Sequence, residues 1–114
     1  RIYMIRVLIN GCNGKMGQEV IKAIQNNEKF AVLNGVDKEE NADYIFPVYT
    51  DISDIKEKPD VIVDFSVPVA TMQILEYAKN NKVPIVIATT GLSEEERQAI
   101  DKAIYSQNIY KMKE

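Results

Sequence analysis

The sequence contains no histidine, and its only cysteine is Cys12. The absence of histidine removes the commonest acid–base side chain and the commonest metal ligand, so we assign no catalytic residue and no metal site to this chain. One cysteine cannot form an internal disulfide, which is typical of the reducing cytoplasm. The sequence also lacks an apolar run of about 18–20 residues and a visible signal peptide, so we expect no membrane association.

The sequence has no excess of basic residues either. Its 14 Lys and Arg residues against 17 Asp and Glu residues give a formal net charge of -3. This balance leaves no electrostatic footprint for nucleic acid, so we expect no nucleic-acid partner. With 114 residues, the chain is predicted to form one domain, 1–114, which is short for a complete two-domain enzyme.

The segment Ile5–Gly17, IRVLINGCNGKMG, carries the clearest functional motif. The apolar run Ile5–Ile9 predicts a parallel strand buried on both faces. Glycines at positions 11, 14 and 17 follow it, and an amphipathic run predicts a helix over Lys15–Asn27. A strand, a glycine-rich turn and a helix N-terminus form an anion site, because unpaired N–H groups and the helix dipole face the ligand. Glycine also lets a pyrophosphate approach the backbone closely.

The glycine spacing is G-x-x-G-x-x-G, because Asn13 and Met16 stand where the commoner G-x-G-x-x-G fingerprint needs glycine. A P-loop is excluded, since Gly14-Lys15 is followed by methionine and not by Ser or Thr. The alternative interpretation is a tight turn that only packs the helix on the strand. We favour nucleotide binding because three glycines lie directly between a buried strand and a helix.

Strands and helices alternate along the rest of the chain. The patterns predict strands at Phe30–Val36, Val61–Ser66 and Val83–Ala88, an edge segment at Tyr44–Tyr49, a helical turn near Ile52 and Ile55, helices over Pro68–Asn80 and from the Ser93/Glu96 capping box to Tyr105, and the start of a strand at Ile109–Met112. This order predicts an α/β fold, a Rossmann-type doubly wound parallel sheet with helices on both faces.

Ligands of such sheets bind at the carboxyl ends of the strands, so the turns there are predicted to converge. Asp37 ends the second strand, where a carboxylate binds the adenosine ribose and favours NAD. Lys38 offers a cation for the 2′-phosphate of NADP, so NADH and NADPH both remain open. The alternative is that Asp37 and its neighbours form a solvated loop.

Other candidate residues also follow strands. Phe65 and Ser66 are positioned to contact the nicotinamide or its ribose, and the hydroxyls of Thr89 and Thr90 suit the same end of a cofactor. For Asp64 we favour a structural role, hydrogen-bonded to neighbouring backbone N–H groups. For Cys12 we favour a small loop residue over a reactive thiol. No tyrosine has lysine four residues later, which argues against a short-chain dehydrogenase.

Four ordered segments, VLINGCNGKMGQEV, GVDK, PDVIVDFSVP and VPIVIATTGLSEEE, together resemble the dihydrodipicolinate (4-hydroxy-tetrahydrodipicolinate) reductase family over Met4–Ala103. The resemblance implies hydride transfer from NADH or NADPH to a cyclic dicarboxylate in the diaminopimelate route to lysine. It implies a ribose contact at Asp37 and a 2′-phosphate contact at Lys38. It further implies pyrophosphate contacts from Gly11, Cys12, Asn13, Gly14, Lys15 and Met16, and a nicotinamide end lined by Ala88, Thr89 and Thr90. Ala88 departs from the glycine that the family usually has there.

The family's second domain, with its His-His-x-x-x-Lys stretch and Gly-Thr turn, has no counterpart in this sequence. We therefore expect a truncated chain without reductase activity of its own, which meets the small dicarboxylate substrate only together with the missing domain. Its exposed docking surface would make self-association possible. The alternatives are a non-catalytic dinucleotide-binding or redox-sensing module and an oxidoreductase with a different second domain.

Overall fold

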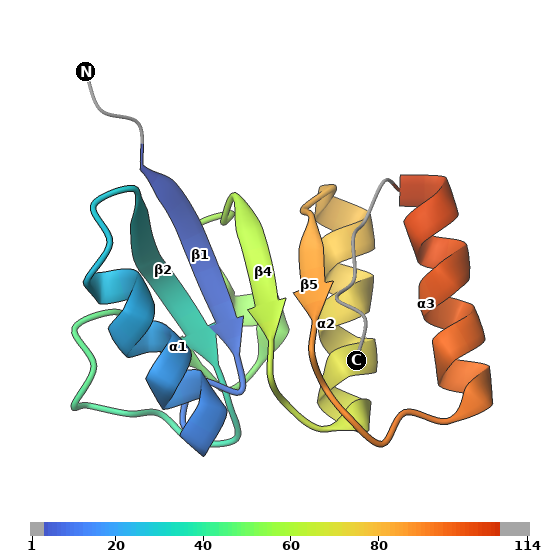
Figure 1. Ribbon diagram of the computed structural model, residues 1–114, viewed down its shortest axis with the longest axis horizontal. Coiled ribbons are helices and arrows are strands. Elements are labelled where there is room, and N and C mark those ends of the chain that lie inside the picture. The colour runs from blue at the N-terminus through green and yellow to red at the C-terminus, as the bar shows by residue number, and fades with distance from the viewer. Residues whose placement is uncertain (1–3, 108–114) are drawn as a thin grey trace.

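The computed structural model describes residues 4–107, which form a five-stranded parallel sheet flanked by helices (Figure 1). In chain order the elements are β1 (Ile5–Asn10), α1 (Lys15–Gln25), β2 (Phe30–Val36), β3 (Val48–Tyr49), the 3-10 helix η1 (Ile52–Asp54), β4 (Val61–Asp64), α2 (Pro68–Asn81), β5 (Ile85–Ile87) and α3 (Glu94–Gln107). The strand order is β3-β2-β1-β4-β5, and every neighbouring pair is parallel. The predicted Rossmann-type α/β fold is confirmed.

The strand order reverses at β1. The chain runs outward from β1 to β2 and β3, and then returns to place β4 on the other side of β1. Asn10, the last residue of β1, consequently pairs with Val36 of β2 on one side and with Asp64 of β4 on the other. Ligands of open α/β sheets bind at this kind of reversal, outside the carboxyl ends of the strands.

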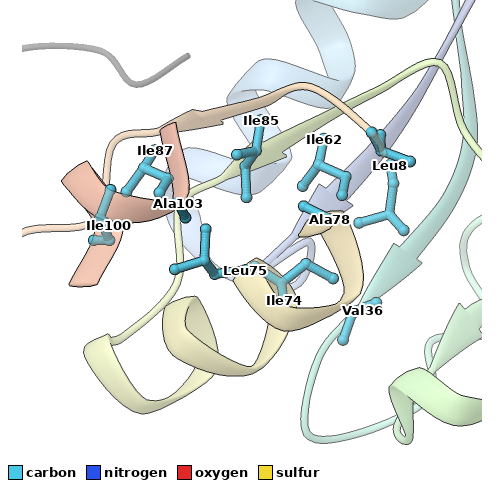
Figure 2. Packing of buried hydrophobic residues seen from close by; sticks show 11 residues of the cluster. Leu8, Val36, Ile62, Ile74, Leu75, Ala78, Ile85, Ile87, Ile100 and Ala103 are labelled. Carbon is cyan, nitrogen blue, oxygen red and sulfur yellow. The ribbon is translucent and has the colours of Figure 1, made fainter. Parts of the chain in front are cut away.

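Successive residues of β1 enter two separate cores, because side chains of a strand alternate between the faces of a sheet. Val7 and Ile9 pack with Ile21 of α1 on one face, whereas Leu8 belongs to the cluster on the other face. Figure 2 shows this second cluster, in which α2 and α3 cover the sheet with apolar side chains that include Ile74, Leu75, Ala78, Ile100 and Ala103. The predicted placement of helices on both faces is confirmed (Figure 1).

The edge segment predicted at Tyr44–Tyr49 forms a strand only at its end, Val48–Tyr49. Pro47 before it has no N–H to donate, but its carbonyl oxygen accepts the N–H of Gly35 at 2.9 Å. Tyr44 and Phe46 stack with ring centroids 4.7 Å apart. These side chains therefore pack the segment onto the sheet with little help from strand pairing.

The helices largely follow the sequence signals. Ser93 and Glu96 form the predicted capping box, in which each backbone N–H donates to the other side chain, at 2.8 and 3.1 Å. Helix α1 ends at Gln25, two residues before the predicted Asn27, and the strand predicted at Ile109–Met112 lies outside the described residues. Over residues 4–107, no helix is both long and apolar enough to span a membrane.

Replacing Gly17 by alanine should destabilise the fold, because the added Cβ would overlap the carbonyl oxygen of Gly11 and lie 3.0 Å from the Cα of Cys12. An overpacked contact costs about 1–3 kcal/mol, whereas alanine gains at most about 1 kcal/mol of helix propensity. We expect a lower urea midpoint for Gly17→Ala.

Gly14→Ala is the matched control, since its Cβ would lie 3.4 Å from the oxygen of Gly11, an ordinary contact. Its urea midpoint should stay close to that of the unchanged protein. Equal midpoints for the two variants would contradict the proposed close packing at Gly17.

Candidate functional site

A groove of about 920 Å³ lies at the carboxyl edge of the sheet, within the size range of about 300–1,000 Å³ usual for ligand pockets. The turns after β1, β2 and β4 all contribute to it. Seven residues predicted from the sequence to bind a cofactor line this groove: Gly11, Asn13, Gly14, Asp37, Lys38, Phe65 and Ser66. The fold thus brings together residues that are more than fifty positions apart in the sequence.

The glycine-rich turn presents the N-terminus of α1 to the groove. Gly14 is the N-cap residue, and over residues 4–107 no side chain caps this end; the first turn of α1 also contains no acidic residue. The N–H groups of a first helical turn have no intrahelical partner. A Cβ on Gly14 would meet only the oxygen of Gly11, at 3.4 Å, so the space beside the helix end is open. These features fit a pyrophosphate.

Gly11 permits the close approach of the turn after β4. Its φ of 86° lies in the left-handed region, where a non-glycine residue is strained. A Cβ at this position would overlap the carbonyl oxygen of Phe65 and lie 3.1 Å from the Cα of Ser66. The backbone of the turn after β1, at Gly11, is therefore in direct contact with the backbone of the turn after β4, at Phe65 and Ser66.

Asp37 connects the glycine-rich turn to the end of β2. Its carboxylate accepts the N–H of Asn13 at 2.8 Å and the N–H of Lys38 at 2.7 Å. The Asn13 side chain donates to the carbonyl of Glu39 and accepts from Asn41, both at 2.9 Å. The loop after β2 is thereby fastened to the glycine-rich turn, and the half-buried Asp37 carboxylate remains at the groove surface.

The predicted structural role of Asp64 agrees with its position, but its expected partners were wrong. The carboxylate accepts hydrogen bonds from four side chains, those of Asn10, Ser66, Thr71 and Thr89. The following backbone N–H groups are engaged elsewhere: Phe65 donates to the carbonyl of Asn10, and Ser66 donates to the hydroxyl of Thr89, both at 3.0 Å.

Six predicted cofactor-binding residues do not line the groove: Cys12, Lys15, Met16, Ala88, Thr89 and Thr90. Cys12 is fully buried, because its side chain packs directly on the backbone of Gly35. A Cβ on Gly35 would lie only 2.7 Å from the sulfur of Cys12. Thr89 is also buried, and its hydroxyl donates to Asp64. Both side chains face the interior. For Cys12 this agrees with the favoured interpretation as a small loop residue, whereas for Thr89 it is contrary to the prediction that its hydroxyl is available to a cofactor.

Several residues that line the groove were missed from the sequence. They are Thr50, Asp51 and Ile52 after β3, and Val67, Val69, Gln73 and Glu76 around the start of α2. One signal available in the sequence was the position of Val67 and Val69, directly after the predicted strand Val61–Ser66. In the structure these apolar residues are 46% and 64% exposed. Over residues 4–107 the structure contains no group of three or more His, Cys, Asp or Glu residues that could hold a metal ion.

The five-stranded parallel sheet, its reversal at β1 and the uncapped helix end at the groove define a Rossmann-type α/β domain. Residues 5–112 match the family described as "Dihydrodipicolinate reductase, N-terminus". The chain therefore belongs to the dihydrodipicolinate reductase family, which confirms the resemblance found in the sequence.

Named relatives agree with this assignment. The 4-hydroxy-tetrahydrodipicolinate reductase of Caldanaerobacter subterraneus subsp. tengcongensis is 48% identical over 100 residues, which are 88% of this chain and 39% of the relative. The enzyme of the same name from Clostridium novyi is 35% identical over 99 residues, 87% of this chain and 39% of the relative. This chain thus spans about two fifths of the length of these relatives.

Solved structures have the same Rossmann-type fold. The dipicolinate-bound dihydrodipicolinate reductase from Paenisporosarcina sp. TG-14 superposes with a TM-score of 0.80 at 29% identity, covering 95% of this chain and 46% of that one. Homoserine dehydrogenase of S. aureus gives a TM-score of 0.83 at 15% identity, covering 100% of this chain and 33% of that one. The second likeness concerns the fold alone.

The thiol of Cys12 should be unreactive in the folded protein. Burial, and then the charge of Asp37, raise its pKa from 9.0 to about 12, so the thiol stays protonated at pH 8. We expect a thiol reagent such as dithionitrobenzoate to react on the order of 10³-fold more slowly at pH 8 in buffer than in urea, because the thiolate is the nucleophile.

Raising the pH from 8 to 10 should accelerate the reaction about tenfold in urea, where the thiol titrates near its ordinary pKa and becomes mostly ionised. In the folded protein the acceleration should be about 100-fold, because at a pKa of about 12 the thiolate fraction still rises tenfold with each pH unit. No second cysteine contributes to the signal. A fast reaction in buffer with the same pH dependence as in urea would contradict the buried position of Cys12.

Proposed function

We propose that this chain is the cofactor-binding part of a 4-hydroxy-tetrahydrodipicolinate reductase, and that it binds NADH or NADPH. The observation that carries the proposal is the uncapped N-terminus of α1, which faces an open groove next to Gly14. Membership in a reductase family supports this function over the alternative of a non-catalytic redox-sensing module. The whole enzyme would reduce a cyclic dicarboxylate of the diaminopimelate route to lysine.

The groove offers complementary surfaces for the parts of a dinucleotide. The backbone at Gly11–Gly14 and the first turn of α1 would hold the pyrophosphate. Asp37 would accept hydrogen bonds from the adenosine ribose, and Lys38 lies beside it for a 2′-phosphate. Ile52 and Val67 supply apolar surface suited to a planar base. The bound cofactor supplies the hydride, whereas the chain binds and orients it.

In the proposed enzyme, this chain would bind the cofactor, and the remainder of the enzyme would bind the dicarboxylate substrate. Self-association through the surface that faces the remainder is part of the same proposal. Substrate binding would belong to the whole protein, since the relatives have about two and a half times the length matched here. Self-association would instead arise in this chain on its own, where that surface is uncovered.

The chain should bind NADH by itself, and Gly14→Val should abolish this binding without unfolding the protein. The valine side chain would occupy the space proposed for the pyrophosphate, while Gly14 has an ordinary, negative φ of -72° and no close contact. Calorimetry and energy transfer from protein to nicotinamide measure the affinity.

We expect weak binding in the unchanged chain and at least about a tenfold loss in the valine variant, equivalent to about 1.4 kcal/mol. Circular dichroism and urea unfolding provide the control for folding. A folded, unchanged chain that fails to bind at millimolar NADH would rule out the proposed function.

Lys38→Ala should weaken NADPH more than NADH, because only NADPH carries the 2′-phosphate. The loss of a charge-assisted contact is worth on the order of 1–3 kcal/mol. Asp37→Asn should do the opposite, weakening NADH and sparing NADPH, since the neutral amide no longer repels the phosphate.

Asparagine is preferable to alanine at position 37, because its side-chain oxygen can still accept the N–H of Asn13. The two dissociation constants are measured for each variant by calorimetry. The same change for both cofactors in either variant would show that the loop after β2 does not reach the ribose.

A further inference from the structure

The carboxylate of Asp64 is fully buried at the end of β4 and is surrounded by uncharged donors. One carboxylate oxygen accepts from the amide of Asn10, at 2.9 Å, and from the hydroxyl of Ser66. The other accepts from the hydroxyls of Thr71, at 2.6 Å, and Thr89, at 2.8 Å. Each oxygen therefore has two hydrogen bonds, which compensate the cost of removing the carboxylate from water.

The four donors come from four segments of the chain. Asn10 ends β1, Ser66 lies in the turn after β4, Thr71 is in the first turns of α2, and Thr89 follows β5. Two of these donors, Asn10 and Ser66, also line the groove, whereas Asp64 does not. The carboxylate can consequently act on a ligand only through the groups that it holds.

The hydroxyl of Thr89 transmits the effect of Asp64 to the groove. Because this hydroxyl donates its hydrogen to Asp64, its oxygen is left to accept the backbone N–H of Ser66, at 3.0 Å. The Asn10 amide additionally reaches the hydroxyl of Ser66 at 3.2 Å and the carbonyl of Ala70 at 3.3 Å. Ser66 is therefore fixed through both its backbone and its side chain.

Ser66 and Phe65 form the wall that touches the glycine-rich turn at Gly11. A shift of this wall would move the surface on the β4 side of the groove and leave the opposite side, at Asp37 and Lys38, in place. The two halves of a dinucleotide would then be affected unequally. This difference separates a positioning role from a general loss of stability.

We propose that Asp64 is a positioning residue for the nicotinamide half of the cofactor, acting through Thr89 and Ser66 without contacting the cofactor. This inference rests on the proposed function, because it assigns the β4 side of the groove to the nicotinamide riboside. The proposed role requires a carboxylate at position 64. An amide of the same shape would present hydrogens to two of the four donors, and the chain of hydrogen bonds to Ser66 would reverse or break.

The test is Asp64→Asn, compared with the unchanged chain for two ligands, NADH and ADP, which lacks the nicotinamide riboside. We expect the dissociation constant of NADH to rise by about tenfold and that of ADP to change by less than about twofold. Thr89→Val should have the same effect, because valine cannot link Asp64 to Ser66, and it serves if Asp64→Asn does not fold.

Thr71→Val is the matched control, since it removes a donor to Asp64 from a residue that does not line the groove. The Thr71 hydroxyl lies 3.4 Å from that of Ser66, but each of the two donates its one hydrogen to Asp64, so neither holds the other in place. Thr71→Val should lower the free energy of unfolding, and it should change the dissociation constants of the two ligands by the same factor. A proportional weakening of NADH and ADP binding in Asp64→Asn and Thr89→Val would overturn the proposal, and so would unchanged binding of both ligands.

Backbone hydrogen exchange tests the positioning independently of any ligand. The N–H of Ser66 should lose protection in Asp64→Asn and Thr89→Val, whereas the N–H of Phe65, bonded to the carbonyl of Asn10, should keep it. Protection of Ser66 that is unchanged in both variants would overturn the role of Asp64 even if no cofactor binds. Failure of the unchanged chain to bind NADH would instead overturn the proposed function.

Discussion

The groove depends on a close backbone contact at Gly11. This residue donates its N–H to the carbonyl of Val36 at 2.8 Å, and it leaves no room for a Cβ against the carbonyl of Phe65. Its own carbonyl oxygen lies where a side chain on Gly17 would stand. The end of β2, the turn after β4 and helix α1 therefore all approach the same residue. Their distances from one another, and so the width of the groove, are set by the absence of side chains there.

The glycine-rich turn also determines how the groove attracts an anion. Among the charged side chains of residues 4–107 that line it, Asp37, Asp51 and Glu76 are acidic and only Lys38 is basic. A phosphate is thus attracted mainly by the backbone at the end of α1, whose N–H groups and dipole point outward. A backbone site of this kind works only if the turn is held rigidly, which explains why Asp37 and the side chain of Asn13 fasten it to the loop after β2.

The sequence predicts most of the fold because β1, β4 and α2 have strong apolar patterns, and it predicts the turns that immediately follow these strands. It cannot predict that Thr50–Ile52 reach the groove, since this depends on a two-residue pairing of β3 with β2. Nor does it reveal which way a loop side chain points. Cys12 turns inward because Gly35 leaves space for it, and Thr89 turns inward because Asp64 accepts its hydrogen.

Asp37 and Asp64 show how the sheet gives one residue type two roles. In the sequence, each is an acidic residue at the end of an apolar strand. Strand β4 has β1 and β5 on its two sides and α2 across its end, so Asp64 is enclosed by donors from four segments. Strand β2 has only the short β3 beyond it, so Asp37 remains half-buried at the groove. The place of each strand in the sheet therefore decides which carboxylate is available to a ligand and which one holds the protein groups around it.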